Sequence, residues 1–169
     1  MTRMLTDIPQ TNDTKTTARL RAETHLAPIE DIVADIAAGK MVVLVDDEDR
    51  ENEGDLIMAA EAITPETVNF MITQGKGLLC VPMTAEHART LNLAPMVERN
   101  EDDFGTSFTV SCDAIADFGI TTGISASDRA ATINLLASGG VASNFHRPGH
   151  VFPPVSYTHL RAHETDSYL

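Results

Sequence analysis

A short acidic stretch, VDDEDRENEGD at residues 45–55, has the composition of a site that binds a cation or moves protons. It places seven carboxylates and one arginine in eleven positions. Charges of one sign so close together repel unless a cation, the arginine or water screens them. Two readings stay open: a solvated surface loop, or a site for Mg²⁺ or Mn²⁺, which take one or two carboxylates and leave room for substrate oxygens.

A calcium-binding EF-hand is the alternative that the spacing excludes. Positions 1, 3, 5 and 6 of such a loop would be Asp49, Glu51, Glu53 and Gly54. Position 12 must supply a bidentate carboxylate, but it would be Ala60. The flanking segments also have the pattern of strands, whereas an EF-hand needs helices.

The elements around the acidic stretch must hold it in place. Apolar runs predict strands at about 41–45, 56–60, 78–83 and 106–112. Helical spacing and capping residues predict helices at about 28–38, 65–75, 84–91 and 127–137. Because strands and helices interleave along 169 residues, we expect a single layered α/β or α+β domain.

Charge and hydropathy exclude several classes of partner. A formal net charge of −13 disfavours binding to nucleic acid or to anionic membranes. No run of eighteen apolar residues indicates a membrane span, and the N-terminus lacks the apolar core of a secretory signal. We therefore predict a cytoplasmic protein. Cys80 and Cys112 are too few and too far apart for a disulfide scaffold, so we interpret them as free thiols.

Five motifs in a fixed order carry a resemblance to a known family. They are DEDRENEGDLIMAAE, GLLCVPM, FGTSFTVS, TTGISASDRA and HRPGHVFP. Together they resemble 3,4-dihydroxy-2-butanone 4-phosphate synthase, a lyase of riboflavin biosynthesis. The resemblance implies a three-layer α/β/α sandwich and a homodimer with active sites shared between subunits. It also implies a requirement for Mg²⁺ or Mn²⁺, and conversion of D-ribulose 5-phosphate into L-3,4-dihydroxy-2-butanone 4-phosphate and formate.

The resemblance assigns roles within the acidic stretch. Arg50 and Glu51 match the family's substrate-contacting pair, and Glu51 also matches its metal-binding carboxylate. Glu53 matches a catalytic acid of the pocket, and Asp55 matches a substrate contact. Carboxylates of both kinds suit a sugar phosphate that loses protons beside a divalent cation.

Three residues outside the acidic stretch complete the implied site. Cys80 matches a pocket cysteine with a catalytic role, and Thr106 matches a residue that approaches the substrate. His150 matches an essential histidine that reaches the pocket from the partner subunit, and a histidine suits proton transfer near neutral pH.

The pattern of the family is expected to stop after HRPGHVFP. We predict an N-terminal arm at 1–24, the synthase domain at 25–153 and a tail at 154–169 that is foreign to the family and an artefact. The resemblance places a second metal ligand and the phosphate-binding residues in a later segment. This sequence therefore predicts an incomplete fold with impaired activity, or alternatively a non-catalytic metal-binding or dimerisation fragment. Continuation into a GTP cyclohydrolase II domain stays open.

Overall fold

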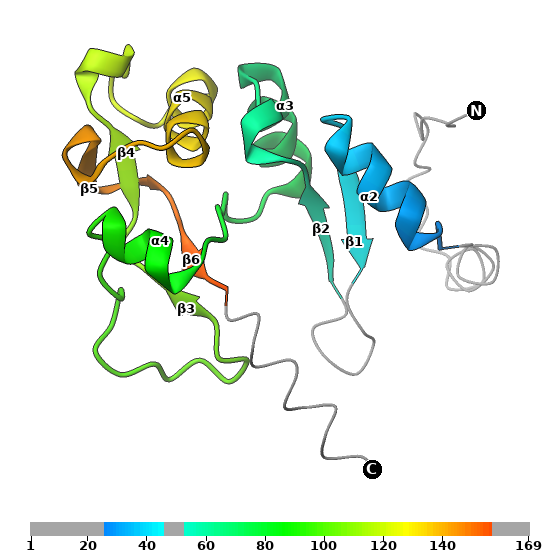
Figure 1. The fold of residues 1–169 in the computed structure, drawn as a ribbon, viewed down its shortest axis with the longest axis horizontal. Helices are drawn as coiled ribbons and strands as arrows, with labels where there is room; N and C mark the ends of the chain where they lie inside the picture. Colours follow the sequence, from blue (N-terminus) through cyan, green and yellow to red (C-terminus); the bar gives the residue numbers. More distant parts are fainter. Residues whose placement is uncertain (1–25, 46–52, 157–169) are drawn as a thin grey trace.

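The computed structural model describes residues 26–45 and 53–156, in which helices and short strands alternate (Figure 1). In chain order the elements are α2 (Ile29–Ala37), β1 (Val42–Val45), β2 (Gly54–Ile57), α3 (Pro65–Phe70), α4 (Ala85–Thr90), β3 (Ser107–Phe108), β4 (Cys112–Ala114), α5 (Ala126–Ala137), β5 (Phe145–Val151) and β6 (Pro154–Val155). The mixed α/β architecture predicted from the sequence is confirmed. None of these described helices has the length and apolar character needed to cross a membrane.

The strands of the described residues pair in three antiparallel ladders, β1 with β2, β3 with β6 and β4 with β5. The ladder of β1 and β2 brackets the acidic stretch, with Val45 opposite Gly54 and Val42 opposite Ile57. The ladder of β4 and β5 contains an irregularity, because Cys112 pairs with Val151 while the next residue, Asp113, pairs with His146. That irregularity lets β5 carry four extra residues past β4.

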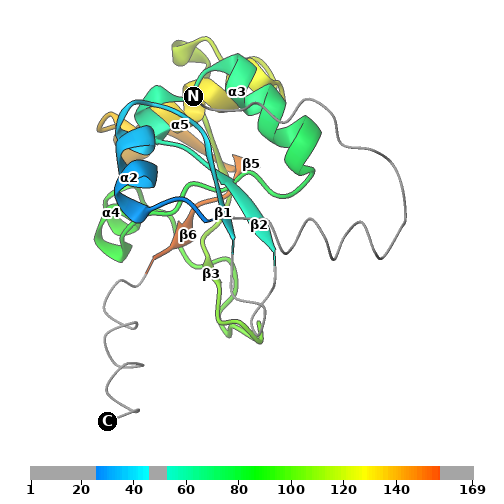
Figure 2. The same cartoon turned by 90° about the vertical axis from the view of Figure 1, so that its right-hand side faces the viewer.

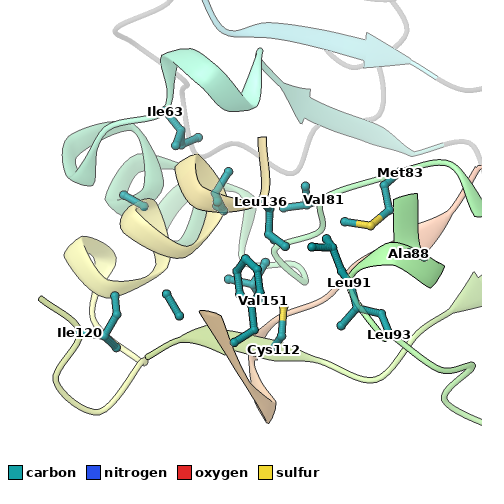
Figure 3. Close-up of a cluster of buried hydrophobic side chains, with 14 of the residues drawn as sticks. Ile63, Val81, Met83, Ala88, Leu91, Leu93, Cys112, Ile120, Leu136 and Val151 are labelled. Atoms are coloured by element: carbon teal, nitrogen blue, oxygen red, sulfur yellow. The ribbon is translucent and has the colours of Figure 1, made fainter. Parts of the chain in front are cut away.

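The core lies where α3, α4 and α5 meet the β4–β5 ladder (Figure 3). Leu91, Leu136, Val68 and Val151 are all at most 2% exposed. Helix α5 begins cleanly because the Ser125 hydroxyl accepts a hydrogen bond from the backbone N–H three residues later. Burial of these aliphatic side chains supplies most of the stability of this half of the molecule.

Two predicted strands are interrupted in the structure. The segment 78–83 forms only isolated bridges, Cys80 with Phe152 and Met83 with Val155. The N–H groups of Val81 and Met83 both donate to the segment opposite, but Pro154 of that segment has no N–H to donate in return. The predicted strand at 106–112 is divided into β3 and β4. Between them Thr109 turns inward, and both its N–H and its hydroxyl donate to the carbonyl of Pro153.

The segment from α2 to β2 lies at the other side of the molecule (Figures 1 and 2). Helix α2 lies beside β1, and none of its residues is buried. Within β1 only Val42 is buried, while Val43, Leu44 and Val45 are each more than half exposed. This segment therefore contributes little to the core.

Candidate functional site

A cavity of about 510 Å³ gathers three of the predicted site residues. Asp55 reaches it from β2, Cys80 from the segment before α4, and Thr106 from the residue before β3. The rest of the wall is mainly apolar and includes Met71 and Leu79. A mostly apolar pocket with a few polar groups on one side is typical of a site for a small molecule.

The register of β2 explains how the acidic stretch meets this cavity. Asp55 pairs with Leu44 of β1, which fixes the direction of its side chain. Glu53 immediately precedes the strand and is exposed. Glu53 is not among the residues that line the cavity.

Thr106 is held by the polar loop that precedes it. The carboxylate of Asp102 accepts a hydrogen bond of 2.7 Å from the Thr106 backbone N–H. The side-chain amide of Asn100 donates to the Thr106 carbonyl at 3.1 Å. These backbone contacts fix the residue without using its hydroxyl.

The two thiols have different surroundings. Partial burial raises the pKa of Cys80, and the nearby Asp55 carboxylate raises it further. Cys80 is therefore a neutral thiol at physiological pH, available as a weak donor to a molecule in the cavity. Cys112 is fully buried, and burial raises its pKa to about 12 although Arg147 opposes the shift. Cys112 belongs to the core.

His150 lies outside this cavity, in the irregular part of β5. Its Nδ1 lies 2.6 Å from Oδ2 of Asp113, and its backbone N–H donates to Oδ1 of the same carboxylate at 2.8 Å. The Asp113 side chain is 10% exposed, whereas that of His150 is 38% exposed. One side of the imidazole is therefore tied to the protein while another faces outward.

Sequence reasoning missed Asp113 and the loop around it. Gly123 packs so closely that a Cβ there would lie 2.0 Å from Oδ2 of Asp113. Asp128 holds this loop by accepting bonds from the Thr121 hydroxyl and the Gly123 N–H, at 2.8 and 2.9 Å. Burial raises the pKa of Asp128, but these hydrogen bonds and those from the Thr121 N–H and the Ser125 hydroxyl lower it on balance. The available signal was a carboxylate directly after the strand predicted at about 106–112.

The predicted metal ligand, Glu51, and its neighbour Arg50 lie outside the described residues. Within residues 26–45 and 53–156, no three His, Cys, Asp or Glu side chains are grouped closely enough to hold a metal ion. Asp55 and Thr106 nevertheless offer the oxygen atoms that Mg²⁺ prefers, and Mg²⁺ needs only one or two protein carboxylates when substrate and water fill its other positions. The chemistry of the cavity rim fits a hard cation.

The fold and these contacts define a mixed α/β protein with a small-molecule cavity and a separate histidine–aspartate pair. Comparison with known families gives its relationship. The model of the 3,4-dihydroxy-2-butanone 4-phosphate synthase family matches residues 30–164. The chain therefore belongs to the 3,4-dihydroxy-2-butanone 4-phosphate synthase family.

Curated relatives agree with this assignment. The chain is 54% identical over 129 residues to 3,4-dihydroxy-2-butanone 4-phosphate synthase of Pseudomonas aeruginosa, a match that covers 76% of this chain and 35% of the relative. It is 59% identical over 131 residues to riboflavin biosynthesis protein RibBA of Nocardia farcinica, covering 77% and 31%. The chain thus spans about a third of the length of these curated relatives.

Solved structures show the same fold. A 3,4-dihydroxy-2-butanone 4-phosphate synthase in complex with two magnesium ions is similar at a TM-score of 0.78 and 44% identity, covering 82% of this chain and 65% of that one. A cation-free form of such a synthase is similar at a TM-score of 0.74 and 43% identity, covering 82% and 64%.

Proposed function

We propose that this chain supplies the substrate pocket of a 3,4-dihydroxy-2-butanone 4-phosphate synthase. The reaction splits D-ribulose 5-phosphate into L-3,4-dihydroxy-2-butanone 4-phosphate and formate, as a step of riboflavin biosynthesis. The observation that carries the proposal is that Asp55, Cys80 and Thr106, which are far apart in the sequence, surround one cavity of suitable size for a sugar phosphate. Family membership and the names of the relatives support the same reaction.

In this proposal each residue acts on a defined part of the substrate. Asp55 and Thr106 bind hydroxyl groups of the ketose, and Cys80 stays a neutral thiol against it. Glu53 and His150 move protons, beginning with removal of the proton on C3. Loss of the C1 hydroxyl as water, a shift of the carbon skeleton, addition of water at C4 and release of C4 as formate follow.

Mg²⁺ or Mn²⁺ is the proposed cofactor, held by Glu51 with the substrate. When bound, it polarises substrate oxygens as a Lewis acid. Arg50 then contributes a positive charge that binds the substrate beside the acids. The magnesium ions of the similar solved structure support this choice of metal.

The domain boundaries at 24 and 153 and the cytoplasmic location remain predictions.

We infer a homodimer, and the placement of His150 supports it. It is absent from the lining of the cavity that holds Asp55, yet its ring is partly exposed. We propose that His150 enters the cavity of a second copy, so that each site uses both subunits. A closed two-fold arrangement would then create two equivalent sites.

The reaction is tested in a chimera, because the chain spans about a third of its curated relatives. Residues 26–153 would replace the matching segment of the Pseudomonas aeruginosa synthase. With Mg²⁺ we expect release of formate from D-ribulose 5-phosphate, and loss of at least about 100-fold in kcat for Asp55→Ala or His150→Ala. A folded but inactive chimera would favour the alternative, a non-catalytic metal-binding or dimerisation fragment. For the 169-residue chain alone we expect much weaker turnover.

Mixing variants tests the shared site. The Asp55→Ala and His150→Ala chimeras, each inactive, are unfolded and refolded together in equal amounts. Half of the dimers would then contain one of each subunit, and each such dimer would have one intact site. We expect recovery of about a quarter of the original activity. No recovery from well-folded mixed dimers would show that both residues act within one subunit.

A further inference from the structure

The structure assigns a positioning role to Asp113: it holds the His150 ring in the tautomer that carries its proton on Nδ1, so that Nε2 is the nitrogen free to accept a proton. Both oxygens of the carboxylate contact His150, at 2.6 Å to the ring and 2.8 Å to the backbone N–H. The role of Nε2 in the reaction rests on the proposed function. The tautomer itself does not.

The chemistry of the two contacts fixes the tautomer. The backbone N–H of His150 can only donate, so it occupies Oδ1 of Asp113. Oδ2 of the ionised carboxylate can only accept, and an unprotonated Nδ1 at 2.6 Å would bring two lone pairs together. The proton of a neutral His150 ring must therefore lie on Nδ1. Nε2 then carries the free lone pair of a base.

The surrounding backbone prevents the pair from separating. A Cβ at Gly123 would lie 2.0 Å from Oδ2 of Asp113 and 2.8 Å from Nδ1 of His150, so this backbone closes directly over the contact. On the other side, the Gly149 N–H donates to the hydroxyl of Ser111 at 3.1 Å. A Cβ at Gly149 would lie 2.1 Å from the carbonyl carbon of Cys112, so β5 lies directly against β4 there.

The exposed side of the His150 ring leaves Nε2 available to accept a proton. The His150 side chain is 38% exposed, and its Nε2 has no hydrogen-bond partner among the described residues. Fixing Nδ1 against a nearly buried carboxylate restricts rotation of the ring, since the second bond anchors the same carboxylate to the His150 backbone. A restricted base loses less entropy when it meets its substrate. Asp113 thus acts through His150 and does not itself contact the substrate.

The native chain tests the tautomer directly by ¹⁵N NMR of labelled histidine. The sequence contains six histidines, so the His150 signals are assigned by their loss in His150→Gln. Above the pH at which the ring becomes neutral, we expect a protonated Nδ1 and an unprotonated Nε2. A proton found on Nε2 of the native chain would overturn the inference, and this measurement requires no catalytic activity.

The variant Asp113→Asn gives a sharper test, because its amide is nearly the same shape. The amide oxygen must still accept from the His150 backbone N–H, which leaves the NH₂ group facing Nδ1. An NH₂ group needs an acceptor, so we expect the proton of the ring to move to Nε2. The matched control is Asp117→Asn, which removes the same charge from an exposed residue and should leave the native tautomer unchanged.

Activity separates positioning from a merely structural role. In the active chimera, Asp113→Asn should lower kcat by about 100-fold with little change in KM. A native tautomer in this variant, or an unchanged kcat together with an inverted tautomer, would contradict the positioning role. If Asp113→Asn does not fold, the ¹⁵N NMR measurement on the native chain still tests the tautomer of His150. An inactive parent chimera with the expected tautomers would reject the proposed reaction and leave the assignment of the ring intact.

Discussion

The two regions that carry the predicted site are built in different ways. The histidine–aspartate region joins β4, β5 and the start of α5, and its two strands contribute Cys112 and Val151 to the core (Figures 1 and 3). The hairpin region consists of α2, β1 and β2, and among its described residues, 29–45 and 53–57, only Val42 is buried. His150 therefore has a fixed geometry within the described chain, whereas Asp55 lies on a two-stranded ladder at its edge.

This difference means that the described residues fix the position of His150 more firmly than that of Asp55. An isolated two-stranded ladder is marginally stable, and apolar residues exposed on it are available to other surfaces. By contrast, two contacts with the nearly buried Asp113 carboxylate fix the position of His150. We expect the hairpin region to open more readily than the histidine–aspartate region.

The largest contrast is expected for a pair of glycines. Gly149→Ala would force a Cβ to within 2.1 Å of backbone atoms of β4, which cannot move without breaking the ladder. We expect it to lower the free energy of unfolding by at least about 4 kcal/mol, or to prevent folding.

The matched control is Gly54→Ala in β2, where the nearest atom to a new Cβ is a side-chain methyl at 3.5 Å. It should change the free energy of unfolding by less than about 0.5 kcal/mol. Urea unfolding of both variants measures the contrast. Equal losses would contradict the difference between the regions.

A pair of leucines gives an intermediate contrast. Leu136→Ala removes a side chain that is 2% exposed in the core and should cost about 3 kcal/mol, because a cavity remains. Leu44→Ala removes one that is 52% exposed on β1 and should cost less than about 0.5 kcal/mol. The comparison uses urea unfolding at one pH. A large loss for Leu44→Ala would mean that β1 is covered in solution, for example by a second copy.

A pair of carboxylates gives the smallest contrast and a pH dependence. Asp128→Asn weakens charged hydrogen bonds to Thr121 and Gly123 and should cost about 2 kcal/mol at neutral pH. Asp35→Asn removes only an exposed contact of 2.6 Å with Lys40, worth less than about 0.5 kcal/mol.

The sign of the pH effect follows from the lowered pKa of Asp128 in the folded chain. Its stabilising contribution is complete above the unfolded pKa, near 3.8, and is lost as the pH falls through the folded value. The difference between the native chain and Asp128→Asn should therefore shrink as unfolding is measured from neutral pH to about pH 3. A constant difference across that range would contradict the role of the charge.

The elements that the sequence predicted well are those with local signals. Capping by Thr64 and Thr84 correctly predicted the starts of α3 and α4. The strand expected at 56–60 instead covers Gly54–Ile57, because pairing with β1 sets its register. The strand expected at 78–83 was wrong in extent, because an apolar run does not reveal that the segment opposite contains Pro154, which cannot donate a ladder hydrogen bond.

The site was predicted in part for the same reason. Motif order gave Asp55, Cys80 and Thr106, and the structure brings these three to one cavity. Their catalytic and binding roles stay predictions, as do those of Glu53 and His150. The partnership of Asp113 with His150 could not be read from the sequence, because the two residues are 37 positions apart and meet only through the irregular pairing of β4 and β5.

By itself the sequence determined the family, the mixed α/β class and the residue types available for chemistry, because motifs, charge and periodicity are properties of neighbouring residues. Only the tertiary structure decided which groups face one another. It placed His150 on a buried carboxylate and away from the cavity of its own chain. Contacts between distant segments depend on packing and strand register, and these are set by the whole folded chain.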